Sequence, residues 1–406
     1  MKKNAVIVFV TVLILNFSVA NAHETLLDRE SLKNSGIDFD VSVTQIYQNN
    51  VRGGLSTHNH RGRYSGRYDF ELYFDGQKIF GLENSLFYMH NRGSWTDAGG
   101  IDGTSVGSIF GVNANAFGDR AFDIVELWYQ QGFNDNKFIL RLGKLDLTGG
   151  FECKGCPVSF DGSSFANNET AQFMNGALVN NPTIPFPDNG LGIIGHYNPV
   201  EWWYISAGIA DAQADFRETG FNTAFHDEDY FFSIAETGIV TEIDSANGPL
   251  QGAYRAGLWY DPQPKGHSDM DKRYRDDTGF YLSFDQMLHR ENADDQQGLG
   301  TFFRYGYAPS KANDLTNFVS AGLQYQGLLE GRDDDVLGFG FAKGFLSDKA
   351  KATYTEDAES VYEIYYNAQI LPTVNVTPSL QYIVHPGAIN SVGNATVLAV
   401  RVSLAF

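Results

Sequence analysis

Apolar and polar positions alternate along the last part of the chain. Between residues 397 and 406 every second position is a large apolar residue, while the intervening positions include Arg401. Residues 361–371 and 374–384 repeat this two-residue period. Such a period is typical of a β-strand whose two faces meet different surroundings. Strands of about ten residues with one apolar face can cross a bilayer at a tilt, so the pattern favours membrane-spanning strands over those of a soluble sandwich.

Extended towards the start of the chain, the pattern divides it into sixteen expected strands joined alternately by short and long connections. They are 37–48, 64–74, 78–90, 123–133, 137–147, 190–197, 201–210, 230–240, 250–260, 278–289, 298–308, 317–328, 335–345, 361–371, 374–384 and 397–406. The stretch Asp75-Gly76-Gln77 is expected to form a tight hairpin turn. The sequence therefore predicts an all-β fold, a transmembrane antiparallel β-barrel with its N- and C-termini in the periplasm.

The longest connection, residues 148–189, is rich in Asn, Gly and Pro. Loops of this length in compact folds usually have a function. A barrel of sixteen strands is wide enough to hold an aqueous channel, so a selective channel needs an element that narrows it. We expect residues 148–189 to fold inward as a constriction loop.

The first residues predict export from the cytoplasm. A basic start, an apolar run and a small-residue cleavage site ending at Ala22 are typical of a secretory signal peptide. We expect residues 1–22 to be removed, residues 23–36 to form a periplasmic segment and residues 37–406 to form the barrel. The formal net charge of −20 argues against a nucleic-acid partner. The mean hydropathy of −0.26 is compatible with a barrel, because its strands alternate apolar with polar residues.

The two cysteines, Cys153 and Cys156, lie within the expected constriction loop. An exported chain meets an oxidising compartment, so we expect a local disulfide between them. A redox-active pair is the alternative, although no thioredoxin-like strand–helix unit surrounds them. A zinc site is disfavoured because no second ligand pair lies close by. We expect no metal and no cofactor.

Charged residues on the polar faces of the expected strands form a candidate substrate path. A charge facing lipid at mid-depth costs roughly 2 to 4 kcal/mol, so these side chains should point into the lumen. The candidates are Arg67, Asp69, Glu71, Glu126, Trp128, Arg141, Arg255, Trp259, Asp285 and Arg304. Sugars offer hydroxyls and flat C–H faces, which suit Arg, Asp or Glu beside Trp. The alternative is that these charges pair with one another across a wet lumen.

Motifs of common hydrolases give no support for catalysis. The histidines form no HExxH array. Gly103-Thr104-Ser105-Val106-Gly107 matches Gly-x-Ser-x-Gly, but it lies in a Gly-rich connection and not at the strand-to-helix turn that a nucleophile elbow needs. The acidic run at residues 332–335 lacks the spacing of a calcium loop, and we expect a solvated turn there. The sequence therefore predicts a protein without enzymatic activity.

Several stretches between about residue 81 and residue 406 resemble the carbohydrate-selective porins, the OprB-like porins of outer membranes. They are residues 140–147, 165–168, 173–175, 181–187, 203–212, 297–300, 334–338 and 380–387. The resemblance implies a sixteen-stranded barrel that passes monosaccharides and similar polyols by diffusion through a waist lined by Arg, Glu and aromatic residues. It draws attention to Glu126, Trp128 and Arg141, which lie beside the family-like Gly-Lys-x-Asp stretch. The insertion with Cys153 and Cys156 departs from the family pattern and leaves the substrate open.

We therefore predict a passive carbohydrate channel in the outer membrane of a Gram-negative bacterium. Its expected partners are outer-membrane lipid and lipopolysaccharide, small sugars and, by analogy with porins, further copies of itself as a homo-oligomer. Two alternatives stay open. One is a general or cation-leaning porin, which the negative charge favours, and the other is a closed barrel that acts as an adhesin or wall anchor.

Overall fold

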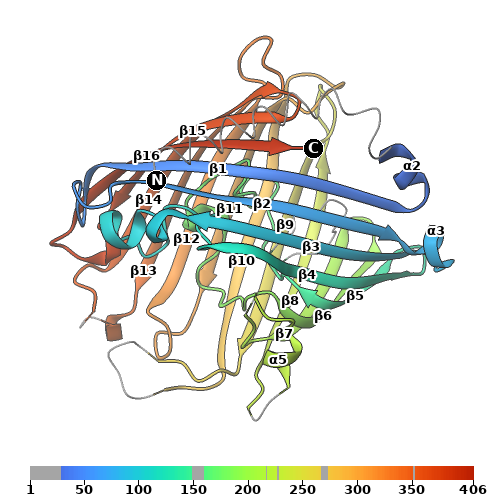
Figure 1. The fold of residues 1–406 in the computed structure, drawn as a ribbon, viewed down its shortest axis with the longest axis horizontal. Coiled ribbons are helices and arrows are strands. Elements are labelled where there is room, and N and C mark those ends of the chain that lie inside the picture. Colours follow the sequence, from blue (N-terminus) through green and yellow to red (C-terminus); the bar gives the residue numbers. More distant parts are fainter. Residues whose placement is uncertain (1–28, 149–159, 216, 226–227, 267–272, 351–352) are drawn as a thin grey trace.

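The chain closes on itself as an antiparallel β-barrel (Figure 1). The computed structural model describes residues 29–148, 160–215, 217–225, 228–266, 273–350 and 353–406. Each strand pairs with its neighbours in the sequence, and β1 pairs with β16 to complete the ring. The predicted signal peptide, residues 1–22, and both Cys153 and Cys156 lie outside the described residues.

Sixteen strands form the wall, as the alternation predicts. The first eight are β1 (Ile37–Gly54), β2 (Gly62–Asp75), β3 (Ser85–Thr96), β4 (Arg120–Phe133), β5 (Phe138–Leu145), β6 (Gly190–Val200), β7 (Trp203–Asp211) and β8 (Phe231–Ile243). The others are β9 (Leu250–Asp261), β10 (Asp277–Arg290), β11 (Gly298–Tyr307), β12 (Leu315–Gln326), β13 (Val336–Leu346), β14 (Ala358–Leu371), β15 (Val374–Val384) and β16 (Gly393–Ala405).

The connection between β2 and β3 is not the predicted hairpin turn. A short helix, α3 (Gly76–Phe80), follows β2, and the Asp75 carboxylate accepts a hydrogen bond from the Lys78 N–H at its start. Gly81 ends the helix in the left-handed conformation with a φ of 72°. The predicted strand 78–90 is therefore wrong by several residues, and β3 spans Ser85–Thr96. The Asp-Gly pair is compatible with both a hairpin turn and a helix start, because Asp is also favoured as the N-cap of a helix.

The two faces of the barrel wall differ in character. Outward side chains are apolar and exposed, as at Leu258 (66%) and Leu398 (47%). Inward side chains are largely polar and buried, as at Arg304 and Arg401, both 0% exposed. This is the arrangement of a wall that meets lipid outside and polar groups inside. Among the described residues, no helix is both long and apolar enough to cross a membrane.

The two ends of the barrel also differ. One end, here called the turn end, carries α2 (Arg29–Asn34), the start of β1, the end of β16, α3 and short turns (Figure 1). The other, here called the loop end, carries the long connections with α5 (Phe221–Ala224), η3 (Asp348–Ala350) and η4 (Pro386–Ala388). That the termini are periplasmic stays a prediction.

Two connections from the loop end turn into the barrel. The first inward segment, residues 97–119, contains η1 (Asp97–Gly99) and η2 (Asp102–Val106), and the second, residues 160–189, contains α4 (Gly176–Val179). The segments are joined where the Ala114 N–H donates to the Met174 carbonyl at 2.7 Å. Their apolar side chains pack with inward residues of β11 to β16 in one buried cluster.

Candidate substrate path

Buried charges on the strands hold the second inward segment against the wall. The Glu363 carboxylate on β14 accepts hydrogen bonds from the N–H groups of Met174 (3.0 Å) and Asn175 (2.9 Å). Arg401 on β16 donates to the carbonyl of Glu169 at 2.8 Å. Both charges are almost fully buried and bind backbone atoms, so they position the segment.

Arg304, predicted as part of the substrate path, has the same role on β11. Its guanidinium donates to the carbonyls of Leu178 (2.8 Å) and Ala166 (3.0 Å) in the second inward segment. The side chain is 0% exposed. Arg304 therefore lies behind the segment, where it anchors the backbone and is covered from the lumen.

Glycines on β11 and β13 let the second inward segment lie close to the wall. A Cβ atom added to Gly300 would come within 2.2 Å of the Phe165 ring. One added to Gly340 would come within 2.8 Å of both Leu178 and Phe173. Such distances are shorter than van der Waals contact, so only glycine permits this approach. The inward segments thus cover the wall around β11 to β16. The second segment also packs against β7 and β8 through Phe160 and Phe186, so the inner face of β2 to β5 is the candidate path.

A column of stacked side chains lines the inner face of β3 to β5. The Arg141 guanidinium lies 4.0 Å from the centre of the Trp128 ring, and Trp128 stacks on Tyr88 with ring centres 4.6 Å apart. The Trp128 indole N–H donates to the Glu126 carboxylate at 3.2 Å. Arg141 donates to Gln130 at 2.8 Å, and among the described residues it has no carboxylate within ion-pair distance. Three of the predicted residues, Glu126, Trp128 and Arg141, are therefore brought together.

Two glutamates of the inner face are held by tyrosine hydroxyl groups. The donors are Tyr73 and Tyr88 for Glu71, and Tyr204 and Tyr281 for Glu236, at 2.5 to 2.8 Å. Glu236 also accepts the Asp161 N–H at 2.9 Å, which ties the start of the second inward segment to β8. Within the described part of the chain, neither carboxylate has a cation within 4 Å, and both are buried, so tyrosine hydroxyl groups are their main partners.

Other predicted residues pair with each other along the wall. Arg67 contacts Asp69 at 2.8 Å, and Arg255 contacts Asp285 at 3.0 Å. For these four residues the geometry matches the alternative interpretation from the sequence, in which inward charges mainly satisfy one another. Trp259 is 2% exposed and belongs, like Trp128 (3% exposed), to a buried apolar cluster.

Several residues of the path escape prediction from the sequence. His90 bonds Asp69 at 2.9 Å and lies 3.5 Å from Glu126, but it lies in the strand whose bounds were wrong. Glu236 is missed for a different reason. Its inward neighbours on β8, Phe232 and Ile234, are apolar, so this face looks as though it should meet lipid. The one sign in the sequence that this face points inward is Glu236 itself, because a charged residue is unfavourable on a lipid-facing surface.

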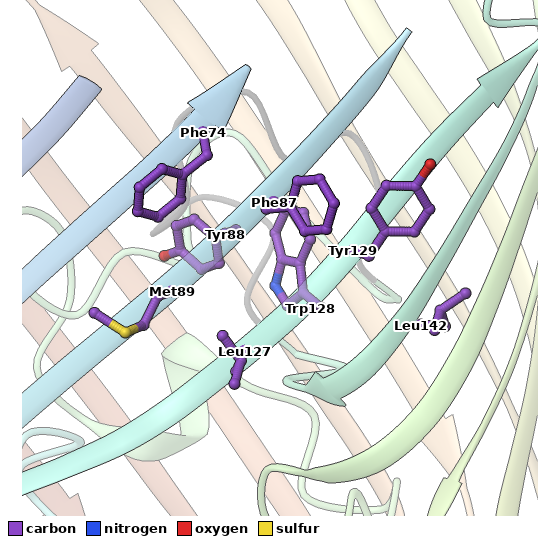
Figure 2. A pocket seen from close by; sticks show the side chains of 8 residues that line it. All are labelled: Phe74, Phe87, Tyr88, Met89, Leu127, Trp128, Tyr129 and Leu142. Atoms are coloured by element: carbon purple, nitrogen blue, oxygen red, sulfur yellow. The ribbon is translucent and has the colours of Figure 1, made fainter. Parts of the chain in front are cut away.

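The hollow drawn in Figure 2 lies on the outer wall and is separate from the path. Its volume is about 290 Å³, and its lining residues are Phe74, Phe87, Tyr88, Met89, Leu127, Trp128, Tyr129 and Leu142. Leu127 is 53% exposed and Leu142 is 44% exposed, as expected of lipid-facing side chains. Trp128 and Tyr88, which are almost fully buried, form the floor of this hollow.

Comparison with known proteins identifies the family. The model of the carbohydrate-selective porin, OprB family, matches residues 59–406. The chain is 22% identical to Porin B of Pseudomonas aeruginosa, over 93% of this chain and 89% of that protein. It is also 22% identical to the putative porin QuiX of Acinetobacter baylyi, over 93% and 91% of the two chains.

Solved structures agree with this assignment at the level of the fold. The high-pH structure of Pseudomonas putida OprB superposes with a TM-score of 0.79 at 19% identity, covering 93% of this chain and 96% of that one. The fold and the family are those of an outer-membrane channel and not of an enzyme. The chain therefore belongs to the carbohydrate-selective porin, OprB family, and is an outer-membrane β-barrel that serves as a sugar channel.

Proposed function

We propose that the channel passes monosaccharides and similar polyols by passive diffusion, and that the column of Arg141, Trp128 and Glu126 selects them. The observation that carries this proposal is the guanidinium 4.0 Å above an indole whose N–H bonds a carboxylate. An aromatic face suits the C–H surface of a sugar ring, and the charged groups on either side exchange hydrogen bonds with its hydroxyls.

We further propose that the second inward segment, residues 160–189, narrows the lumen at this column. The anchoring by Glu363, Arg401 and Arg304 supports this role, because it fixes the segment on the wall around β11 to β16. A solute then passes between the segment and the inner face of β2 to β5. Selectivity arises from this width and from side chains that bind weakly enough to release the solute.

Liposome swelling with the refolded chain tests the proposal. Glucose, a disaccharide and a zwitterionic amino acid smaller than either sugar are compared at equal osmotic strength. Glucose is expected to enter faster than the amino acid, and Trp128→Ala is expected to remove that preference while the barrel stays folded. Leu258→Ala, a change on the outer wall, is the matched control and should leave the preference intact.

A cation-leaning porin is the second candidate, favoured by the formal net charge of −20. Reversal potentials across a salt gradient distinguish the two functions. Swelling that follows solute size alone, together with a cation-selective potential, would favour the second. Absence of swelling and of single-channel current would instead favour a closed barrel.

A further inference from the structure

One stretch between β7 and β8 crosses the rim of the barrel and lies on its outer side. Residues 217–225, here called the outer segment, contain α5. A Cβ atom added to Gly220 would meet the Leu191 side chain at 2.8 Å. Leu191 faces outward, because it lies two residues before Ile193, which is 44% exposed on the lipid-facing side of β6. Figure 1 places α5 beside the ends of β6 and β7.

Lys144 holds the outer segment in place. It pairs in register with Leu127 and Leu191, both outward, so its side chain also points to the lipid side. Its ammonium group donates to the carbonyls of Glu218 (2.5 Å) and Ile124 (2.8 Å), and the residue is only 4% exposed. A charged lysine facing lipid is destabilising unless it is covered. The outer segment provides this cover.

Two ion pairs lie beside the outer segment. Arg217 bonds Asp215 at 2.7 Å, and Arg120 at the start of β4 contacts Asp123 at 3.7 Å. The Arg217 guanidinium holds the pKa of Asp215 low, at about 2, so both groups stay charged near neutral pH. Glu218, the other charged residue of the segment, accepts a hydrogen bond from the Asn222 side-chain amide at 2.8 Å.

The apolar side chains of the outer segment, in contrast, have no cover. Phe221 is 66% exposed and Phe225 is 68% exposed, and their rings stack with centres 6.3 Å apart. No large apolar side chain in the described part of the chain is more exposed than Phe225. Phe122, on the adjacent part of β4, is 62% exposed. An exposed apolar patch of this kind marks contact with a membrane or with a partner.

We propose that Phe221 and Phe225 insert among the acyl chains of the leaflet at the loop end, so that the outer segment is a lipid anchor. The patch continues the lipid-facing surface formed below it by Leu127 and Ile193. A single helical turn is too small for a stable interface with a second copy, which requires on the order of 1,000 Å². Lipid needs no complementary shape, and binding to it scales with the apolar area buried, which the two phenyl rings supply at the edge of the lipid-facing wall.

Nitroxide labelling of the refolded chain in bilayer vesicles tests the proposal. Cys153 and Cys156 are replaced by serine, and a nitroxide is attached through Phe225→Cys while Phe221 stays in place. Collisions with molecular oxygen, which concentrates in acyl chains, are compared with collisions with a water-soluble nickel chelate. Leu258→Cys on the outer wall is the lipid control, and Asp333→Cys in an exposed turn is the water control.

The label at position 225 is expected to match the Leu258 control, with high access to oxygen and low access to nickel. Access to nickel equal to that of the Asp333 control would overturn the proposal, since the segment would then lie in water. Low access to both reagents, with spin–spin broadening between labelled copies, would also overturn it and would assign the patch to an interface between copies. Recovery of the folded, heat-modifiable barrel is checked for each variant before labelling.

Discussion

Replacing Glu363 by alanine is expected to release the tip of the second inward segment. The carboxylate accepts the N–H groups of Met174 at 3.0 Å and Asn175 at 2.9 Å, and the hydroxyl of Ser379 at 2.8 Å. Hydrogen bonds to a charged group each contribute about 1.5–3 kcal/mol. The two backbone bonds therefore hold α4 to β14 with about 3–6 kcal/mol, and Glu363→Ala removes both.

The effect on the channel follows from this magnitude. Every 1.4 kcal/mol changes an equilibrium constant about tenfold, so a loss of about 3 kcal/mol increases the undocked population roughly 100-fold. An undocked segment no longer narrows the lumen, and the variant should show larger and noisier single-channel conductance. It should also admit the disaccharide in liposome swelling at a rate closer to that of glucose.

Asp335→Ala is the matched control. Asp335 is also a buried carboxylate that accepts a backbone N–H, from Gln369 at 2.9 Å, but it lies in the turn between β12 and β13. This variant should lower the stability of the barrel without changing conductance. If Glu363→Ala folds and keeps both the wild-type conductance and the wild-type size limit, the second inward segment does not set the width of the lumen.

Two further predictions concern the inward segments. Gly340→Val places side-chain atoms where Phe173 and Leu178 now lie, so it should lower the stability of the barrel by about 1–3 kcal/mol, measured by thermal unfolding in detergent. Burial raises the pKa of Asp102 from 3.8 to about 6, so the native state binds this proton more tightly than the unfolded state. The resulting stabilisation is complete below about pH 4 and is lost as the pH rises through about 6, a change of at most about 3 kcal/mol. Asp102→Asn should flatten this part of the pH profile, and equal pH dependence in both proteins would refute the assignment.

The alternation of apolar and polar residues predicts most of the wall, because a strand between lipid and a polar lumen must keep its two faces distinct. It fails where the inner face is itself apolar. On β8, Phe232 and Ile234 face inward and pack with Phe186 and other buried residues, so the pattern of this strand does not tell inside from outside. It also fails at Asp75, whose side chain can begin either a turn or a helix.

The site was less predictable than the wall. Arg141 and Arg304 both occupy polar positions of an alternating strand, and nothing in their local sequence separates them. Arg141 stacks on Trp128, whereas Arg304 is covered by the second inward segment and bonds its carbonyls. The difference depends on where a distant loop folds. Arg304 and its partner Leu178 are more than 100 residues apart in the sequence. Strand periodicity carries no information about it.

The first inward segment has a consequence for how the barrel assembles. The Val112 carbonyl accepts hydrogen bonds from Gln48 on β1 at 2.7 Å and from Gln381 on β15 at 2.9 Å. These residues flank the seam where β1 meets β16. The two ends of the chain are thus bridged by a loop from its first third, so docking of this loop and closure of the ring stabilise each other.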